Sequence, residues 1–523
     1  MNDATLEPLD AALQRGMSIA HFAALQPDAP AIISPFGRRT FGELNVRANQ
    51  LVRRFRAAGL REGDAVAVVA RNRPAFVETY AATLRGGFRF TPVNWHLTAE
   101  EAGYVIDNCE AKAVVYDGTL PTAIDAMRYA PRCDLKLIAD GRAEGFLDYE
   151  AELAPLARHD IADPVRGSSM LYTSGTTGRP KGVYRRVQPP LVRTAAQTAA
   201  ARVPGRDLDL CTGPAYHAAP LAFNVASPLS AGVGIVFMDK WDAEETLRLI
   251  AEHRVTHTHM VATMFHRLLH LPRRVRKRYD VSSLRYLLHG AAPCPVHDKR
   301  AMIDWLGPIV YEYYAATEGG GGYFITPQEW LKKPGSVGKS PTPELTRVLD
   351  DDGNELGRNA TGTLYFKAPD VGRFEYFKAP DKTSQSYRGD WFTLGDMGYL
   401  DDEGYLFLNG RSAETIISGG VNIYPQEVDA ELMKHPSVLD VCTVGVPNAE
   451  WGEEVKSIVI PALGREASDA LAQEIIAFAK SRLAAFKTPR SIEFVSELPR
   501  LDSGKIQRRL VRARFWAGRE RQI

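Results

Sequence analysis

The chain has 523 residues, of which 45% are hydrophobic and 24% are charged, a balance typical of a folded globular protein. This composition excludes a mainly disordered or collagen-like chain, and the length suffices for about three domains of ~150 residues. The formal net charge is +1, from 64 basic and 63 acidic residues. We therefore do not expect nucleic acid as a partner, because proteins that bind polyanions carry a large basic excess.

Cysteine usage and the amino terminus indicate the compartment. Five cysteines are scattered along the chain without C-x-x-C spacing, which predicts free, mostly buried thiols in a reducing environment. No apolar run approaches the ~18 residues of a membrane span. Residues 1–14 carry acidic rather than basic side chains, so they do not resemble a signal peptide. We expect a cytoplasmic protein with at most peripheral membrane contact; a homodimer remains open.

The first two hundred residues alternate helix and strand signals. Thr40 and Glu43 fit a capping box at the start of an amphipathic helix that ends near Gly59. A short apolar strand follows Asp64, a helix is expected over 74–85, and a second strand follows Gly86. This alternation predicts an α/β fold with largely parallel sheets.

The pattern changes after about Gly335. Turn clusters at 350–353 and 401–404 separate short alternating strands such as 362–367, which predicts antiparallel strands forming a small β-barrel. From about Tyr424 helix and strand signals alternate again. Strands are expected at 440–446 and 454–460, and a helix capped by Ser468 is expected over 468–483. We expect a large domain over 1–409 and a small α+β domain over 410–523.

Residues 172–182, Tyr-Thr-Ser-Gly-Thr-Thr-Gly-Arg-Pro-Lys-Gly, form the most informative segment. Its glycines allow backbone N–H groups to converge on an anion, its hydroxyls add donors, and Lys181 adds a positive charge. These properties predict a phosphate-binding loop. It is not a Walker A loop, because the G-x-x-x-x-G-K-[ST] spacing is absent.

The same string resembles the phosphate-binding loop of the adenylate-forming superfamily, which contains acyl-CoA synthetases, luciferases and peptide-synthetase adenylation domains. Further segments match in the family's order, so that the resemblance covers nearly the whole chain: Tyr-Ala-Ala-Thr-Glu at 314–318, Trp-Phe-Thr-Leu-Gly-Asp at 391–396, Gly-Arg at 410–411, Ser-Gly-Gly-Val-Asn-Ile-Tyr-Pro at 418–425 and Pro-Arg-Leu-Asp-Ser-Gly-Lys at 499–505. The resemblance implies a large domain and a mobile carboxy-terminal domain that together form an acyl-CoA ligase of the EC 6.2.1 type.

The implied reaction joins a carboxylic acid to AMP, releases pyrophosphate, and then passes the acyl group to coenzyme A. ATP and Mg²⁺ are therefore expected. The resemblance places sixteen residues at the ATP: Thr173, Ser174, Gly175, Thr176, Thr177, Gly178, Lys181, Gly290, Ala291, Ala292, Tyr313, Tyr314, Thr317, Asp396, Arg411 and Lys505.

Four of the expected site residues are catalytic by this resemblance. Lys181 holds the β- and γ-phosphates, Thr317 contacts the α-phosphate, and Glu318 ligates Mg²⁺, a hard cation that prefers oxygen ligands. Lys505 bridges the α-phosphate and the substrate carboxylate, where a cation stabilises the transition state. Asp396 and Arg411 hold the ribose, and Gly290 to Ala292 with the two tyrosines line the adenine slot.

The sequence says less about which carboxylic acid is the substrate and which thiol accepts the acyl group. By the resemblance, amino-acid-activating members of the family carry an Asp in the segment that corresponds to 214–223. This segment has no carboxylate, which disfavours an amino-acid substrate. Small residues at 218, 219, 222 and 315 indicate room for a medium- or long-chain fatty acid or a bulky alicyclic, steroid side-chain or aryl acid. Gly419 and Gly420 are expected to line the tunnel for free CoA. The expected acyl-binding residues are His217, Phe223, Val225, Met260, Thr263 and Ala315.

Alternative functions remain at this stage. One is delivery of the acyl group to a carrier protein, another is luciferase-like oxidation, and a third is a non-catalytic protein that binds acyl-adenylate or CoA. The basic run 273–278 has two interpretations. It is either a solvent-exposed loop or a site that binds acidic lipids or the phosphates of CoA. Ala413 departs from the Asp or Lys usual in the family's hinge, which leaves the polar anchoring of the hinge open.

Overall fold

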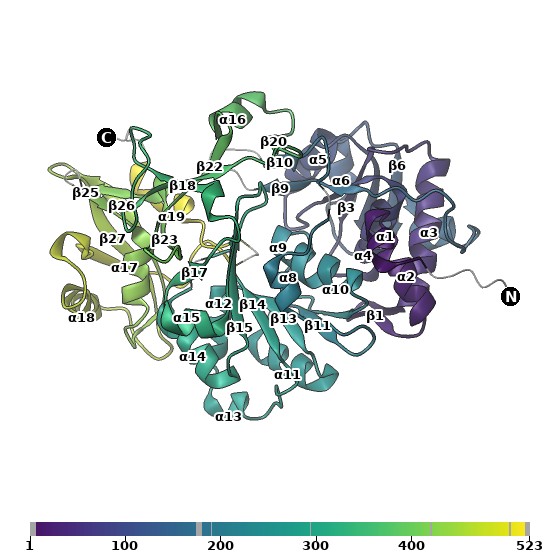
Figure 1. Ribbon diagram of the computed structural model, residues 1–523. Coiled ribbons are helices and arrows are strands. Elements are labelled where there is room, and N and C mark those ends of the chain that lie inside the picture. The colour runs from purple at the N-terminus through teal and green to yellow at the C-terminus, as the bar shows by residue number, and fades with distance from the viewer. Residues whose placement is uncertain are drawn as a thin grey trace.

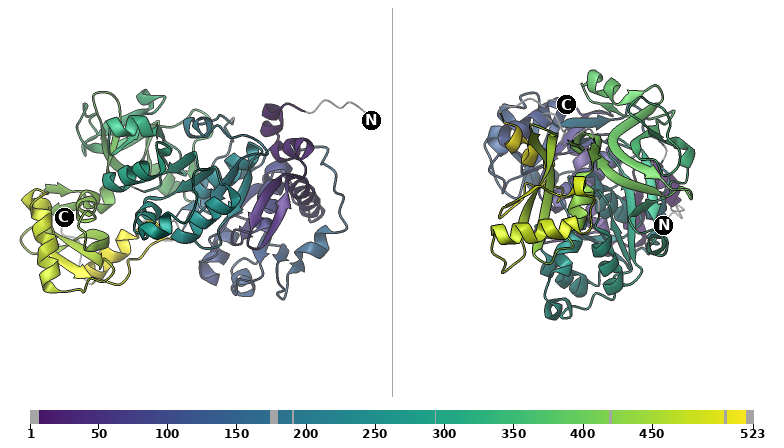
Figure 2. Two further views of the ribbon diagram at one scale, coloured as in Figure 1. Left: turned by 90° about the horizontal axis from the view of Figure 1, so that it is seen from below. Right: turned by 90° about the vertical axis from the view of Figure 1, so that its left-hand side faces the viewer.

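The structure is a computed structural model that describes residues 7–173, 180–189, 191–292, 294–418, 421–501 and 504–517. The molecule is elongated, with the amino-terminal elements at one end and the carboxy-terminal elements α17, β26 and β27 at the other (Figures 1 and 2). The α/β fold class and the separate small carboxy-terminal unit expected from the sequence are confirmed.

The amino-terminal six-stranded sheet is parallel throughout. Its order is β7-β6-β5-β3-β4-β8. The capping box that precedes it is present, since the Thr40 side chain accepts from the Glu43 N–H and Glu43 accepts from the Thr40 N–H. The strands are β3 (Ala65–Val69), β4 (Arg89–Pro92), β5 (Ala111–Asp117), β6 (Leu135–Ala139), β7 (Leu147–Asp148) and β8 (Ser168–Ser169).

The central eight-stranded sheet is parallel inside and antiparallel at its two edges, β1–β2 and β15–β16. It carries the residues that lead into the predicted adenine slot at the carboxyl ends of β14 and β15. In spatial order its strands are β16 (Gly321–Ile325), β15 (Val310–Ala315), β14 (Tyr286–His289), β13 (His257–Met260), β11 (Leu208–Cys211), β12 (Gly234–Phe237), β1 (Pro30–Ser34) and β2 (Gly37–Thr40).

Helices lie between these two sheets and on their outer faces. One apolar cluster joins Ile235 of the central sheet, Val66 of the amino-terminal sheet and Phe55 of the helix between them. Two further clusters cover the outer faces. The helices of these layers are α1 (Leu9–Gln14), α2 (Ser18–Leu25), α3 (Phe41–Ala57), α4 (Pro74–Gly86), α5 (Ala99–Asn108), α6 (Ala123–Arg128), α7 (Tyr149–Leu153), α8 (Ala195–Ala199), α9 (Ala218–Pro220), the π-helix η1 (Leu221–Ala226), α10 (Ser227–Ser230), α11 (Ala243–His253), α12 (Ala262–Leu269), α13 (Arg273–Arg276), α14 (Val296–Leu306) and α15 (Pro327–Lys332). Helix α16 (Pro380–Gln385) lies instead against β20 (Glu375–Tyr376) and β21 (Tyr387–Arg388).

The predicted β-barrel is an open antiparallel sheet. Its order is β17-β23-β22-β19-β18, with β21 beside β22, and in the described part of the chain the end strands β17 and β18 do not pair with each other. The turn clusters predicted the strands correctly, but turn signals do not specify whether the last strand meets the first. The strands are β17 (Ser336–Gly338), β18 (Thr346–Leu349), β19 (Gly362–Lys367), β21 (Tyr387–Arg388), β22 (Trp391–Leu400) and β23 (Leu406–Arg411).

A small three-stranded sheet connects this region to the phosphate loop. Strand β10 (Lys181–Tyr184) lies between β9 (Leu171–Thr173) and β20 (Glu375–Tyr376). Both pairings are antiparallel, with Lys181 opposite Thr173 and Val183 opposite Tyr376. Segments almost two hundred residues apart therefore meet beside the predicted phosphate site.

The carboxy-terminal sheet has the order β25-β24-β27-β26, with β28 parallel to β27. Strand β23 ends at Arg411 and β24 begins at Ile416, so the boundary expected near 410–413 spans the end of one sheet and the start of the connection to the next. Ser468 caps α18 by accepting from the Leu471 N–H, as expected. The elements are β24 (Ile416–Ser418), β25 (Val421–Ile423), α17 (Pro425–Leu432), β26 (Val438–Asn448), β27 (Gly452–Pro461), α18 (Asp469–Lys480), β28 (Ser491–Phe494) and α19 (Arg508–Trp516).

Two expectations on the chain's environment can be compared with the structure. All five cysteines are free thiols, and four of them are buried. Among the helices of the described ranges, none combines the length and the apolar character that crossing a membrane requires.

Candidate active site

A cavity of about 530 Å³ lies between the large domain and the carboxy-terminal domain. Its wall includes Tyr314, Asp396, Arg411 and Lys505, which belong to four of the segments recognised in the sequence. The fold therefore brings these distant segments together around one space large enough for a small-molecule ligand.

The carboxylate of Asp396 is held from two sides. The Tyr314 hydroxyl donates to Oδ2 at 2.7 Å, and Arg411 Nε donates to Oδ1 at 3.0 Å. The second contact follows from strand register, because Asp396 and Arg411 are directly opposite each other in the β22–β23 pair. Burial and the neighbouring carboxylate raise the pKa of Tyr314 well above its usual value. Asp396 is thus fixed in orientation at the cavity wall.

Lys505 reaches the same cavity from the loop before α19. The loop approaches closely because Gly504 has no side chain: a Cβ there would lie 2.6 Å from the Thr263 Oγ1, and its φ is +81°. Burial and the neighbouring Arg411 lower the pKa of Lys505, whereas Glu414 and Asp396 oppose this shift. The ammonium therefore lies in partly buried, partly cationic surroundings that favour an incoming anion.

Glu414, the neighbour of Ala413 at the expected hinge, forms hydrogen bonds to the carboxy-terminal domain. Its Oε2 accepts from Gln426 Nε2 at 2.7 Å and from Arg508 Nε at 3.2 Å. Arg508 is buried and also pairs with Asp429 at 2.8 Å. The residue beside Ala413 therefore contacts the carboxy-terminal domain through two side chains.

The residues expected to form the adenine slot lie close together in the structure. Ala291 and Ala292 line the cavity together with Tyr313 and Tyr314. Gly290 packs directly against Tyr313, since a Cβ at Gly290 would lie 2.5 Å from the ring atom Cε1. The close strand contact thus requires a glycine at 290. The binding of adenine there remains a prediction.

Lys181 and Glu318 meet around Tyr376. Lys181 Nζ is 4.7 Å from the centroid of the Tyr376 ring, and the Tyr376 hydroxyl donates to Glu318 Oε1 at 3.0 Å. Burial and Lys382 lower the pKa of Lys181, and the Glu318 charge opposes this shift. A lysine and a carboxylate close together suit a ligand that carries phosphates and a cation.

The Glu318 carboxylate is a suitable protein ligand for a Mg²⁺ ion that is also bound by substrate phosphates. The described residues contain no group of three or more His, Cys, Asp or Glu side chains that could hold a metal ion. Mg²⁺ is commonly held by one or two carboxylates together with substrate phosphates and water. Glu318 as the protein ligand of a nucleotide-bound Mg²⁺ fits that pattern.

Several predicted site residues lie outside the described residues: Ser174, Gly175, Thr176, Thr177, Gly178, Gly419 and Gly420. Thr173 is described and lies opposite Lys181 in the β9–β10 pair. Thr317 is described as well, and its carbonyl accepts from Arg185 Nη2 at 3.2 Å. The assigned roles of all these residues remain predictions.

The predicted acyl-binding residues fall into separate groups. Thr263 and Ala315 line the large cavity. His217 precedes α9 as its N-cap residue. Val225 and Met260 are almost fully buried in two different apolar clusters, neither of which contains Phe223. The sequence could not separate them, because Phe223 and Val225 lie on η1 and Met260 lies on β13, and the direction in which each side chain points depends on tertiary packing.

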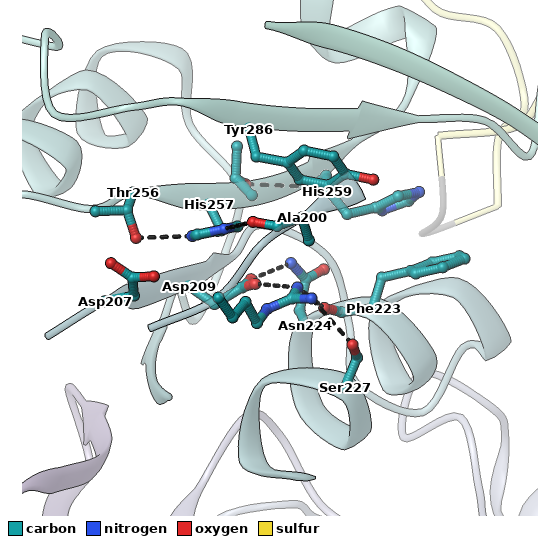
Figure 3. Close-up of polar contacts among 12 residues, drawn as sticks. Ala200, Asp207, Asp209, Phe223, Asn224, Ser227, Thr256, His257, His259 and Tyr286 are labelled. Carbon is teal, nitrogen blue, oxygen red and sulfur yellow. Dashed lines mark hydrogen bonds and ion pairs between the residues drawn. The ribbon is translucent and has the colours of Figure 1, made fainter. Parts of the chain in front are cut away.

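Phe223 forms an aromatic wall with Tyr313, which lines the large cavity. Its ring lies 4.6 Å from that of Tyr313 and 5.6 Å from that of His259, the latter in a stacked arrangement (Figure 3). Burial and the neighbouring His289 lower the pKa of His259 to about 3. This ring is therefore neutral at neutral pH.

A buried polar network lies behind that aromatic wall (Figure 3). Arg202 pairs with Asp209 at 2.8 Å, and Asn224 Nδ2 donates to the other Asp209 oxygen at 2.7 Å. Phe223 and Arg202 border a cavity of only about 10 Å³, about one water molecule. The open space at this site therefore lies in the large cavity.

Sequence reasoning missed four contacting residues of this region: Arg185, Tyr376, Glu414 and Arg508. None of the four lies in a segment that was recognised as a family motif. Each forms its hydrogen bond with a residue more than ten positions away in the sequence. Glu414 had a weak signal as the acidic neighbour of the unusual Ala413. The others had no signal in the sequence.

Segments expected to bind nucleotide and a lysine of the second domain surround one cavity, an arrangement that fits an adenylate-forming enzyme. Comparison with known proteins agrees. The AMP-binding enzyme family matches residues 19–374, and the AMP-binding enzyme C-terminal domain family matches residues 427–505. The chain belongs to the AMP-binding enzyme family and is an AMP-forming acid–thiol ligase of the acyl-CoA synthetase type.

Similar proteins match nearly the whole chain. Indoleacetate–CoA ligase of Aromatoleum aromaticum is 31% identical over 94% of this chain and 96% of its own. The long-chain-fatty-acid–CoA ligase FadD13 of Mycobacterium tuberculosis is 30% identical over 96% of this chain and 98% of its own. The crystal structure of the anthranilate CoA ligase AuaEII with anthranoyl-AMP superposes with a TM-score of 0.85, at 24% identity over 96% of this chain and 97% of that one.

Proposed function

We propose that the protein activates a hydrophobic carboxylic acid with ATP to an acyl-adenylate and then forms its CoA thioester. The observation that supports this most directly is the presence of Lys505 in the cavity that also holds Tyr314, Asp396 and Arg411. A cation from the second domain can act there on a nucleotide bound by the first.

The first step needs charge stabilisation rather than a base. A carboxylate oxygen attacks the α-phosphorus of ATP, a P–O bond forms, and the bond to pyrophosphate breaks. The attacking group is already an anion at neutral pH, so no proton has to be removed. Lys505 faces the negative charge that develops as two anions approach, and such a contact contributes on the order of 10²–10³ in rate.

The large domain holds the nucleotide in this proposal. Asp396 accepts hydrogen bonds from the ribose, and Lys181 neutralises phosphate charge. Thr317 donates to the α-phosphate, and Glu318 holds the Mg²⁺ of the nucleotide. When bound, Mg²⁺ neutralises phosphate charge and thereby favours departure of pyrophosphate.

In the second step the CoA thiol loses its proton, its sulfur attacks the acyl carbonyl, and AMP leaves. We propose that free CoA is the thiol and that it passes Gly419 and Gly420 after the carboxy-terminal domain rotates. The stretch between Arg411 and Ile416, which joins two sheets, is the segment in which dihedral changes would produce that rotation.

The acid is proposed to be hydrophobic, of the fatty or aryl type. The named relatives act on indoleacetate and on long-chain fatty acids, which share an apolar body and one carboxylate. In this chain Thr263 and Ala315 face the large cavity, and Phe223 with Tyr313 forms an apolar aromatic wall beside it. These surfaces suit an apolar body.

The test is an acid screen with the purified protein, ATP and Mg²⁺, assayed for AMP with and without CoA. We expect CoA-dependent AMP release and a thioester product with at least one medium-chain, long-chain or aryl acid. Pyrophosphate exchange without CoA-dependent AMP release would indicate another acceptor, such as a carrier protein. No exchange with any acid, together with tight binding of acyl-adenylate, would contradict catalysis and indicate a binding protein.

A further inference from the structure

The segment that follows Glu318 is unusual in composition and in backbone conformation. It consists of four consecutive glycines, Gly319 to Gly322, and all four have positive φ, from +61° to +108°. Glycine loses more conformational freedom on ordering than any other residue. A carboxylate attached to such a segment has little local support, so its position depends on contacts from other elements.

One such contact holds the carboxylate itself. Tyr376 lies on β20 opposite Val183 of β10, and its hydroxyl donates to Glu318 Oε1 at 3.0 Å. This hydrogen bond restricts rotation of the carboxylate and leaves Oε2 for a metal ion. Tyr376 and Lys181 therefore lie on two paired strands, β20 and β10.

A second contact holds the backbone. Arg185, the residue after β10, donates from Nη2 to the carbonyl of Glu318 at 2.7 Å and to that of Thr317 at 3.2 Å. Its guanidinium also lies 3.5 Å from the position that a Cβ at Gly319 would occupy. Arg185 therefore fixes the main chain where the glycine segment begins.

We propose that Tyr376 and Arg185 are positioning residues that hold Glu318 ready to ligate the Mg²⁺ of the bound nucleotide. The inference rests on the proposed role of Glu318. Tyr376 lies on the small sheet that also carries Lys181, and Arg185 directly follows strand β10 of that sheet. The sheet therefore sets the distance between Lys181, the proposed phosphate-binding lysine, and Glu318, the proposed metal ligand.

The carboxylate contact is tested with Tyr376→Phe, which removes one oxygen atom. Mn²⁺ is titrated by electron paramagnetic resonance into protein saturated with α,β-methylene-ATP, whose methylene bridge prevents transfer of AMP to an acid. Loss of a hydrogen bond to a metal ligand weakens metal affinity ~10–100-fold, and we expect a loss of that size. Apparent Mg²⁺ affinity in pyrophosphate exchange should fall in parallel, while the rate recovers at high Mg²⁺.

The control is Tyr387→Phe, because that hydroxyl donates at 2.9 Å to the carbonyl of Phe374 and not to the Glu318 carboxylate. We expect it to bind Mn²⁺ like the wild type. Unchanged Mn²⁺ affinity in Tyr376→Phe would overturn the proposal, and so would equal losses in the two variants, which would indicate a general disturbance of the sheet.

The backbone contact is tested with Arg185→Met against Arg186→Met. Arg186 is exposed and pairs with Glu375. We expect weaker Mn²⁺ binding only for Arg185→Met. Glu318→Gln separates this inference from the proposed function: if it kept full Mn²⁺ affinity, the metal role of Glu318 itself would be wrong, whatever the positioning residues do.

Discussion

The Tyr314 hydroxyl donates to Asp396 Oδ2 at 2.7 Å across 82 residues of sequence. Arg411 Nε donates to the other oxygen at 3.0 Å. The carboxylate proposed to hold the ribose is therefore oriented before any nucleotide arrives. Such orientation reduces the entropy lost on binding.

Tyr314→Phe should weaken ATP binding because it releases one side of Asp396. A hydrogen bond to a charged group contributes about 1.5–3 kcal/mol, so we expect the ATP dissociation constant to rise about ten- to hundredfold in calorimetric titrations. Tyr399→Phe, on the same strand as Asp396, is the matched control. Equal ATP affinities in wild type and Tyr314→Phe would contradict this role.

Arg508→Met should destabilise the carboxy-terminal domain. Arg508 is 7% exposed and pairs with Asp429 and Glu414. Burial raises the pKa of Asp429 even though Arg508 opposes the shift, so the carboxylate depends on its partner. Removing one member of a buried pair costs about 3–5 kcal/mol. Thermal unfolding measures this loss, and the exposed neighbour variant Arg509→Met should unfold like the wild type.

The free energy of unfolding should fall as the pH drops below about 6.5. Burial, with His289, lowers the pKa of His259 to about 3, whereas an unfolded histidine titrates near ~6.5. Between these values the unfolded chain binds the proton and the folded chain does not, so stability is full above ~6.5 and is lost as the pH falls toward 3. Each such group contributes about 1.4 kcal/mol per pH unit.

Urea unfolding between pH 7 and pH 5 tests this linkage. His259→Phe keeps a ring against Phe223 and cannot titrate, so its stability should depend on pH less steeply than that of the wild type. An unchanged slope in the variant would show that other groups account for the acid sensitivity.

Local features were predictable because their causes are local. Thr40 and Glu43 are three residues apart, and the capping box forms as expected. The strand over 362–367 lies between two turn clusters and has the predicted bounds. The phosphate loop and the segment around Lys505 are recognisable as short strings for the same reason.

Features that depend on tertiary pairing were not predictable. Tyr376 meets Glu318 only because β20 joins β10 across almost two hundred residues. The sheet after Gly335 remains open, although its strands were expected to close into a barrel. Val225 resembles a pocket residue in the sequence but is fully buried in the core between the two large sheets.

The most direct test of the account is ATP–pyrophosphate exchange in Lys505→Ala, compared with Lys480→Ala, whose exposed lysine ends α18. ATP binding is measured alongside. We expect Lys505→Ala to bind ATP normally but to exchange pyrophosphate on the order of 10²–10³ times more slowly, and Lys480→Ala to match the wild type. Exchange at the wild-type rate in Lys505→Ala would contradict the proposal that this lysine of the second domain promotes adenylation.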